Sequence, residues 1–194
     1  MADRQMYALD AIDGSLIWKG PGCTVGEEDD AANLGSWVLT DTRSDAFGGK
    51  FHYTACVDPS DSAAMASVKI CTWNFTDQQQ QDTRPDPSNT EGYVYSIYAW
   101  IPDAGGTGVL RRSRNATYVI SYPTGDTTNP TATAKVTVDQ SDPKSWGTWV
   151  KIGQSYFNPS KVELLNTASP DPPPDSSTPG PTAADYCVIA DALM

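Results

Sequence analysis

The sequence predicts an all-β fold, an antiparallel β-sandwich of the jelly-roll kind that begins with a β-hairpin. From Ser36 onward, hydrophobic and polar residues alternate with a period of two, which is typical of strands with one buried face. The 15 glycines and 15 prolines gather with Asp, Asn, Ser and Thr between these segments and mark many turns. No helical periodicity extends over a useful length of the sequence. Together, these observations favour short strands joined by turns.

Residues 1–20 are expected to form the hairpin. Two short apolar segments flank Asp13-Gly14, which is the strongest two-residue signal for a hairpin turn. Residues 21–35 follow as an acidic, glycine-containing linker. The run EEDD at 27–30 predicts a solvated charge cluster, and a structural calcium ion is the alternative, although the spacing of an EF-hand is absent. No other cofactor or metal is expected.

Residues 36–194 are expected to form the sandwich. Its candidate strands are 37–40, 51–55, 67–76, 93–101, 116–122, 131–138, 147–153, 161–165 and 187–193. The segment 93–101 is apolar or aromatic at nearly every position and therefore predicts a central strand with both faces covered. The proline-rich segment 169–184 cannot form a strand ladder, so we expect it to be an extended surface loop.

The net charge argues against nucleic acid as a partner, and the short apolar runs argue against a membrane span. The chain has 24 acidic residues against 13 basic residues, a formal net charge of −11. This negative field would repel a phosphate backbone, so nucleic acid is not an expected partner. The longest apolar runs are far shorter than the roughly 20 residues that cross a bilayer, so no membrane span is expected.

The sequence also favours a protein without catalytic activity. Its single histidine, His52, removes most metal sites and most catalytic devices that pair histidine with serine or cysteine. His52 alternates with Phe51 and Tyr53 and is expected to be a hydrogen-bonded surface residue. Glycosidase chemistry needs two carboxyl groups about 5–10 Å apart, and the aspartates, which stand mostly in turn sequences, single out no such pair.

The four cysteines, Cys23, Cys56, Cys71 and Cys187, contain no CxxC pair, so a zinc ribbon or a thioredoxin-type motif is not expected. They allow three disulfide pairings, among which the sequence does not choose, and four buried thiols are the alternative. The composition is typical of exported proteins, which favours at least one disulfide. Residues 1–10 lack the basic and apolar regions of a signal peptide.

Six segments of residues 36–194 follow one another in a characteristic order. They are Thr72-Trp73-Asn74-Phe75, Tyr95-Ser96-Ile97-Tyr98-Ala99-Trp100-Ile101-Pro102, Arg114-Asn115-Ala116-Thr117-Tyr118-Val119-Ile120, Val136-Thr137-Val138-Asp139-Gln140, Trp146-Gly147-Thr148-Trp149-Val150-Lys151-Ile152-Gly153 and Val188-Ile189-Ala190-Asp191-Ala192-Leu193. This succession resembles the golvesin C-terminal-like domain, which is also appended to xanthan lyases and other secreted bacterial enzymes. The resemblance implies a carbohydrate-binding-like β-sandwich without agreed catalytic residues.

A second resemblance covers residues 6–19, which read Tyr7-Ala8-Leu9-Asp10 and then Gly14 and Trp18. This segment is similar to the end of a quinoprotein-like (PQQ-type) β-propeller repeat. The pattern occurs once, so it accounts for half a blade at most. Residues 36–194 depart from the golvesin pattern in three ways. Asp139 stands where Asn is usual, insertions at 56–66 and 168–185 lengthen two loops, and the cysteines are additions to the pattern.

Aromatic and basic side chains supply the candidate ligand-binding residues. Trp100, before Pro102 at a strand end, and Trp146, in a turn, are candidates for stacking on a sugar ring, with core or interface packing as the alternative. Arg112 and Arg114 belong to the one basic cluster and could hold an acidic sugar, although a solvated strand edge is the simpler interpretation.

Three further residues are assigned structural positions. Trp73 and Trp149 alternate into apolar strands and are expected in the core. Asp191, which stands inside an apolar final strand, is expected to be buried and hydrogen-bonded rather than catalytic.

These patterns lead to one functional expectation and one alternative. We expect a non-catalytic accessory module, secreted, periplasmic or at the cell surface, that binds polysaccharide or anchors a larger assembly. The alternative is a structural subunit of a multiprotein or filamentous assembly, which would form homo- or hetero-oligomers through residues 1–20 and the long loops.

Overall fold

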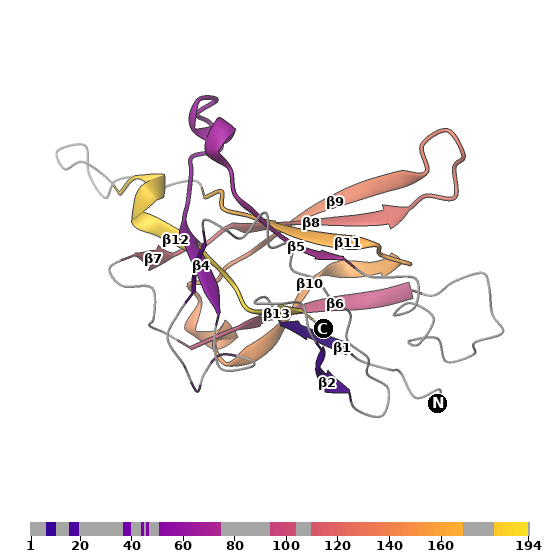
Figure 1. The fold of residues 1–194 in the computed structure, drawn as a ribbon, viewed down its shortest axis with the longest axis horizontal. Coiled ribbons are helices and arrows are strands. Elements are labelled where there is room, and N and C mark those ends of the chain that lie inside the picture. Colours follow the sequence, from indigo (N-terminus) through magenta and orange to yellow (C-terminus); the bar gives the residue numbers. More distant parts are fainter. Residues whose placement is uncertain are drawn as a thin grey trace.

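The computed structural model describes residues 7–10, 16–19, 37–39, 44, 46, 51–74, 94–103, 110–168 and 181–193. Their strands form three sheets, and their helical turns are short 3-10 segments (Figure 1). These segments are η2 (Ala64–Ser67), η3 (Pro143–Ser145) and η4 (Ala183–Asp185). The all-β fold is therefore confirmed, whereas the jelly-roll arrangement stays a prediction. Most of the proline-rich segment and the acidic run at 27–30 lie outside the described residues.

The first sheet joins the two ends of the chain. Its strand order is β10-β6-β13-β1-β2, with antiparallel neighbours throughout. The strands are β1 (Tyr7–Asp10), β2 (Leu16–Lys19), β6 (Val94–Ile101), β10 (Thr148–Phe157) and β13 (Ala192–Leu193). Strands β1 and β2 pair as the expected hairpin, although its Asp13-Gly14 turn lies outside the described residues. Because β1 also pairs with β13, the hairpin extends the sheet that contains β6.

Two four-stranded sheets complete the fold. One has the order β5-β11-β8-β9 and is antiparallel. The other has the order β3-β4-β12-β7, in which β12 and β7 run parallel. Their strands are β3 (Val38–Leu39), β4 (His52–Ala55), β5 (Ile70–Asn74), β7 (Arg111–Arg112), β8 (Ala116–Pro123), β9 (Thr131–Val138), β11 (Lys161–Leu165) and β12 (Tyr186–Ala190).

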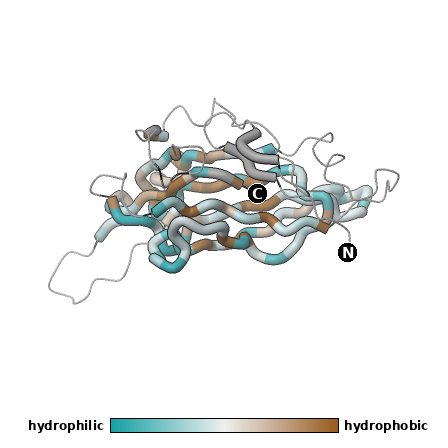
Figure 2. Tube along the Cα trace, turned by 90° about the horizontal axis from the view of Figure 1, so that it is seen from below, coloured by the Kyte–Doolittle hydropathy of each residue, from teal (hydrophilic) through white to brown (hydrophobic). Residues whose placement is uncertain are grey.

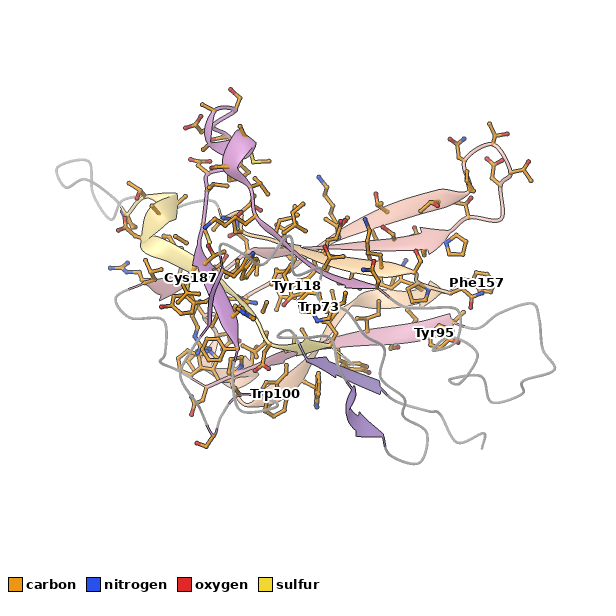
Figure 3. The ribbon with its side chains drawn as sticks, in the orientation of Figure 1. Trp73, Tyr95, Trp100, Tyr118, Phe157 and Cys187 are labelled. Atoms are coloured by element: carbon orange, nitrogen blue, oxygen red, sulfur yellow. The ribbon has the colours of Figure 1, made fainter. Side chains whose placement is uncertain are left out.

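The main hydrophobic core lies between the β5-β11-β8-β9 sheet and the sheet that contains β6. Figure 3 shows Trp73 and Tyr118 between these two layers, and both side chains are almost completely buried. The core position expected for Trp73 is therefore confirmed. Figure 2 shows the alternation that produces this core, since hydrophobic and hydrophilic stretches follow one another along the strands.

Strand β6 is central in its sheet, between β10 and β13, but the prediction that both of its faces are covered is wrong. Ile97, Ala99 and Ile101 point into the core and are buried. Tyr98 and Trp100 alternate with them and are only half-buried. The strand is apolar on nearly every residue because aromatic side chains occupy its outer face as well.

Two polar side chains, those of Asp191 and His52, are buried close to the end of β12. Asp191 separates β12 from β13 at the point where the chain passes from one sheet to another, and it is 3% exposed, as expected. His52 is 8% exposed, so its expected place on the surface is wrong. It lies on β4, directly opposite Ala190 on β12.

Gln140, just after β9, supplies the hydrogen-bond partners of a buried strand. Its Nε2 donates to the carbonyl oxygen of Ile189 at 2.8 Å, and its Oε1 accepts from the backbone N–H of Ile189 at 2.8 Å. Its Nε2 also donates to the Tyr118 hydroxyl at 3.3 Å, and its backbone N–H donates to the Ser113 carbonyl at 2.9 Å. Gln140 is 0% exposed, so these bonds join three segments of the chain without water.

Replacing Gln140 with leucine should lower the free energy of unfolding by about 2–4 kcal/mol, because both backbone groups of Ile189 would remain buried without partners. Urea denaturation with an unchanged m value measures this loss. The matched control is Gln154→Leu on the exposed part of β10, which should change the free energy by less than about 0.5 kcal/mol. A loss below about 1 kcal/mol for Gln140→Leu would contradict the role of the amide.

Candidate functional site

The strongest candidate site is the outer side of the ribbon that β6 and β10 form. The two strands are antiparallel, and their directly paired residues point to the same side. We call the side away from the core the outer ribbon face. Its side chains, in cross-strand pairs from one end to the other, are Trp100 and Trp149, Tyr98 and Lys151, Ser96 and Ser155, and Val94 and Phe157.

Two tryptophans form one end of the outer ribbon face. The rings of Trp100 and Trp149 have centroids 5.4 Å apart and planes inclined at 70°, an edge-to-face contact. Both rings are half-buried. In Figure 3 the Trp100 ring lies on the far side of its strand from Trp73. Trp149, which is expected in the core, is partly buried and packs against the border of the core, and the cross-strand pairing places it beside Trp100.

Polar groups occupy the middle of the outer ribbon face. The hydroxyls of Ser96 and Ser155 are hydrogen-bonded at 2.8 Å across the two strands. The Lys151 Nζ lies 3.4 Å from the Ser155 Oγ, to which it donates. Hydroxyl and ammonium groups therefore lie between the aromatic ends of the ribbon, where they can exchange hydrogen bonds with a ligand that covers both ends.

An irregularity in β10 lies between the two halves of the face. The register shifts between Lys151 and Ser155, and Gly153 within this bulge has a φ of +64°. A Cβ on Gly153 would lie 2.5 Å from the Tyr156 Oη and 2.8 Å from the Val136 Cγ2. Only glycine combines this backbone conformation with this close approach.

Two exposed apolar side chains form the other end of the outer ribbon face. Val94 is 66% exposed and Phe157 is 42% exposed, and they are a direct cross-strand pair. Figure 3 shows Phe157 at the opposite end of the ribbon from Trp100. The next pair inward on the core side, Tyr95 and Tyr156, anchors this end, because the Tyr156 ring is 3% exposed.

Trp146, an expected ligand-binding residue, is engaged within the protein. Its Nε1 donates to the Gln140 carbonyl at 3.0 Å, and the Arg112 guanidinium carbon lies 5.0 Å from its ring centroid. The Arg112 Nη1 donates to the Pro102 carbonyl at 2.6 Å, and its Nη2 donates to the Asp103 carbonyl. This arrangement fastens the end of β6 to β7, and it covers one side of the indole with a cation.

The four expected ligand-binding residues are therefore not one cluster. Arg112 is 7% exposed and uses its guanidinium to bind backbone carbonyls, whereas Arg114 is exposed on the segment that follows β7. Trp100 belongs to the outer ribbon face. Reasoning from the sequence missed Trp149, Tyr98 and Phe157 as candidates, although the alternation of β6 with its buried residues is a signal that places Tyr98 beside Trp100.

The described cysteines are thiols and form no disulfide. Cys56, Cys71 and Cys187 are all buried, whereas Cys23 lies outside the described residues. The expected disulfide is therefore absent among these three, which agrees with the alternative of buried thiols. Cys56 packs in the main core and Cys187 in a second cluster with Phe51 and Ile189. Cys56 directly follows β4, the neighbour of β12, but the two thiols belong to different clusters of the core.

Within the described residues, no group of three or more His, Cys, Asp or Glu side chains is placed to hold a metal ion. In the same part of the chain, no helix has the length and apolar character that a membrane crossing needs. We compared the sequence with protein-family models and curated proteins, and the structure with solved structures, and found no match. The resemblances to the golvesin and propeller-repeat families therefore stay predictions.

The buried thiols should react slowly in the folded protein. Burial, with a smaller contribution from Cys187, raises the pKa of the Cys56 thiol from 9.0 to about 12, so the reactive thiolate is scarce near neutral pH. In a Cys23→Ser variant, a coloured disulfide reagent should label the folded protein far more slowly than the urea-unfolded protein. Because the unfolded thiol ionises at lower pH than the folded one, this group should also lower the free energy of unfolding as the pH rises above about 9.

The control for this measurement is an added thiol at Ala55, which is exposed on β4 next to Cys56. In the same background, Ala55→Cys should react immediately in the folded protein. Equally fast labelling of the Cys23→Ser protein without this addition would contradict the burial of the three native thiols.

Proposed function

We propose that this chain is a non-catalytic accessory module that binds carbohydrate on the outer ribbon face. The observation that carries the proposal is the half-exposed pair of Trp100 and Trp149, held side by side on neighbouring strands. An indole covers the C–H face of a sugar ring, and about 80–100 Å² of buried apolar area contributes about 2 kcal/mol. Two such contacts supply the roughly 4 kcal/mol that corresponds to a millimolar Kd.

The few charges on the outer ribbon face favour a sugar as the ligand over a highly charged protein. Lys151 is the one charged side chain among the eight that define the outer ribbon face, although acidic residues outnumber basic residues across the chain. The remaining groups are aromatic rings, aliphatic groups and hydroxyls. This mixture of stacking surfaces and neutral hydrogen-bonding groups suits the alternating apolar faces and hydroxyl edges of sugar rings.

Three of the described carboxyl groups are unsuited to act as the acid of a glycosidase. The pKa values of Asp58, Asp126 and Asp185 lie below the ordinary value, because their carboxylates accept hydrogen bonds from Ser60, Thr128 and Thr182, respectively. A glycosidase acid needs the opposite shift, since it must hold its proton at the working pH. The proposed role is instead to retain a larger protein on a secreted or cell-surface polysaccharide.

The alternative function is that of a structural subunit, which would use the exposed end of the outer ribbon face for contacts with another protein chain. It would bury the exposed pair of Val94 and Phe157 against another chain. Sedimentation at increasing protein concentration separates the two functions, because a carbohydrate-binding module that acts alone should stay monomeric.

Single Trp100→Ala and Trp149→Ala substitutions should each weaken retention on insoluble polysaccharide by about tenfold or more, because each removes a stacking surface. Pull-down on a panel of cellulose, xylan, mannan and chitin measures the retained fraction. The matched control is Trp146→Phe, which keeps a ring beneath Arg112 and should bind normally. Proper folding of each variant is checked by its urea midpoint.

Two outcomes would contradict this site. One is the failure of the unmodified protein to bind any member of the panel. The other is the loss of retention in Trp146→Phe while Trp100→Ala binds normally, which would move the site to the Arg112 side of the ribbon end.

A further inference from the structure

We infer that the ligand of the outer ribbon face is an internal stretch of an extended, neutral polysaccharide that lies along β6 and contacts both ends of the ribbon. This inference rests on the proposed function and names its ligand class. Its basis is that the face has two separate apolar ends with a polar middle, rather than a single aromatic platform.

The length of the face is the first argument. From Val94 to Trp100, β6 advances six residues, which is about 20 Å at ~3.3 Å per residue. A single sugar ring covers one indole and cannot reach both ends. Contact with both the Trp100–Trp149 pair and the Val94–Phe157 pair therefore requires a chain of several rings.

The shape of the face is the second argument. The contacts lie on one side of two neighbouring strands, and the end formed by Val94 and Phe157 is exposed. The hollows of about 420 and 220 Å³ in the described part of the chain are lined by residues outside the ribbon. A linear face with an exposed end fits a chain that continues past the protein.

The chemistry of the middle is the third argument. The Tyr98 and Lys151 pair and the hydrogen-bonded Ser96 and Ser155 pair offer donors and acceptors between the apolar ends. The ammonium group of Lys151 donates to the Ser155 hydroxyl and is the one charge among these side chains. With a net charge of −11 across the chain, a polyanion would be repelled, whereas a neutral, hydroxyl-rich chain would not.

The rigid backbone supports an extended ligand rather than a coiled one. Strands β6 and β10 are anchored from the core side by Ile97, Ile152 and Tyr156, each almost completely buried. The two apolar ends lie along one pair of strands, so a chain that runs parallel to β6 can contact both of them, whereas a helically coiled polysaccharide turns away from the face between them. β-1,4-linked chains, which are extended, therefore fit better than α-1,4-linked chains, which coil.

Isothermal titration with β-1,4-linked gluco-, xylo- and manno-oligosaccharides, from the disaccharide to the octasaccharide, tests the inference. For the class that binds, the affinity should rise with chain length and then level off once the chain reaches both ends of the face. Phe157→Ser should weaken binding of the octasaccharide by about five- to tenfold and leave the disaccharide unaffected, because it removes only the distant contact. Phe157→Tyr, which keeps the ring, is the matched control and should bind like the unmodified protein.

The remaining outcomes separate the inference from the proposed function. Equal affinity for the disaccharide and the octasaccharide, with normal binding by Phe157→Ser and loss in Trp100→Ala, would overturn the extended ligand and keep the carbohydrate site. Tighter binding of polygalacturonate than of any neutral chain, weakened by salt, would overturn the neutral class. Self-association that Phe157→Ser abolishes, without binding of any oligosaccharide, would overturn both the inference and the proposed function.

Discussion

The constraint on which the rest of the structure depends is the complete burial of β12. All five of its residues are buried, so their backbone N–H and C=O groups must find hydrogen-bond partners within the protein. Strand β4 pairs along one side, but on the other side β7 reaches only Tyr186 and Cys187. The amide of Gln140 occupies the place that a further strand residue would take beside Ile189, because it both donates to and accepts from that residue. One side chain thus completes a ladder that the short strand β7 leaves unfinished.

The same residue connects this ladder to the ribbon. The Gln140 carbonyl accepts from the Trp146 indole, and Trp146 in turn lies beneath Arg112, which binds the carbonyls at the end of β6. The backbone N–H of Gly147 donates to the Ile101 carbonyl at 2.7 Å and starts the pairing of β10 with β6. These contacts join the segments at the end of the ribbon that carries Trp100 and Trp149. Trp146 and Arg112 are engaged within the protein and are not part of the outer ribbon face.

Local sequence patterns predicted the strands well and their environments less well. The bounds expected for β9 and β11 match the structure, since each is a short alternating segment between clear turns. The alternating pattern predicts a strand that ends at residue 153. In the structure, Gly153 instead forms a bulge with positive φ, and the strand continues to Phe157.

The errors at the candidate site have a common physical origin. Whether an aromatic side chain in a strand is buried depends on what the other sheet covers, and the sequence contains no direct signal for that pairing. Trp149 therefore looked like a core residue, and Phe157 fell outside any expected strand. Arg112 belongs to the basic cluster that the sequence assigns to a solvated strand edge or a ligand site, whereas alternation in β7 turns Arg112 inward.

For the carbohydrate binding proposed above, a rigid, shallow face of this kind limits the affinity but also reduces the conformational entropy that is lost on binding. The side chains at both ends of the ribbon are held by cross-strand pairing, so little conformational entropy is lost when a ligand covers them. The contacts remain shallow, because the rings lie on a surface rather than in an enclosed pocket, and a single module should therefore bind weakly. Weak contacts along a polymer with many equivalent positions allow rebinding at neighbouring positions, which raises the retained fraction without greater intrinsic affinity. An accessory module needs this behaviour, since it must keep a larger protein near its polymer and still let it move along the chain.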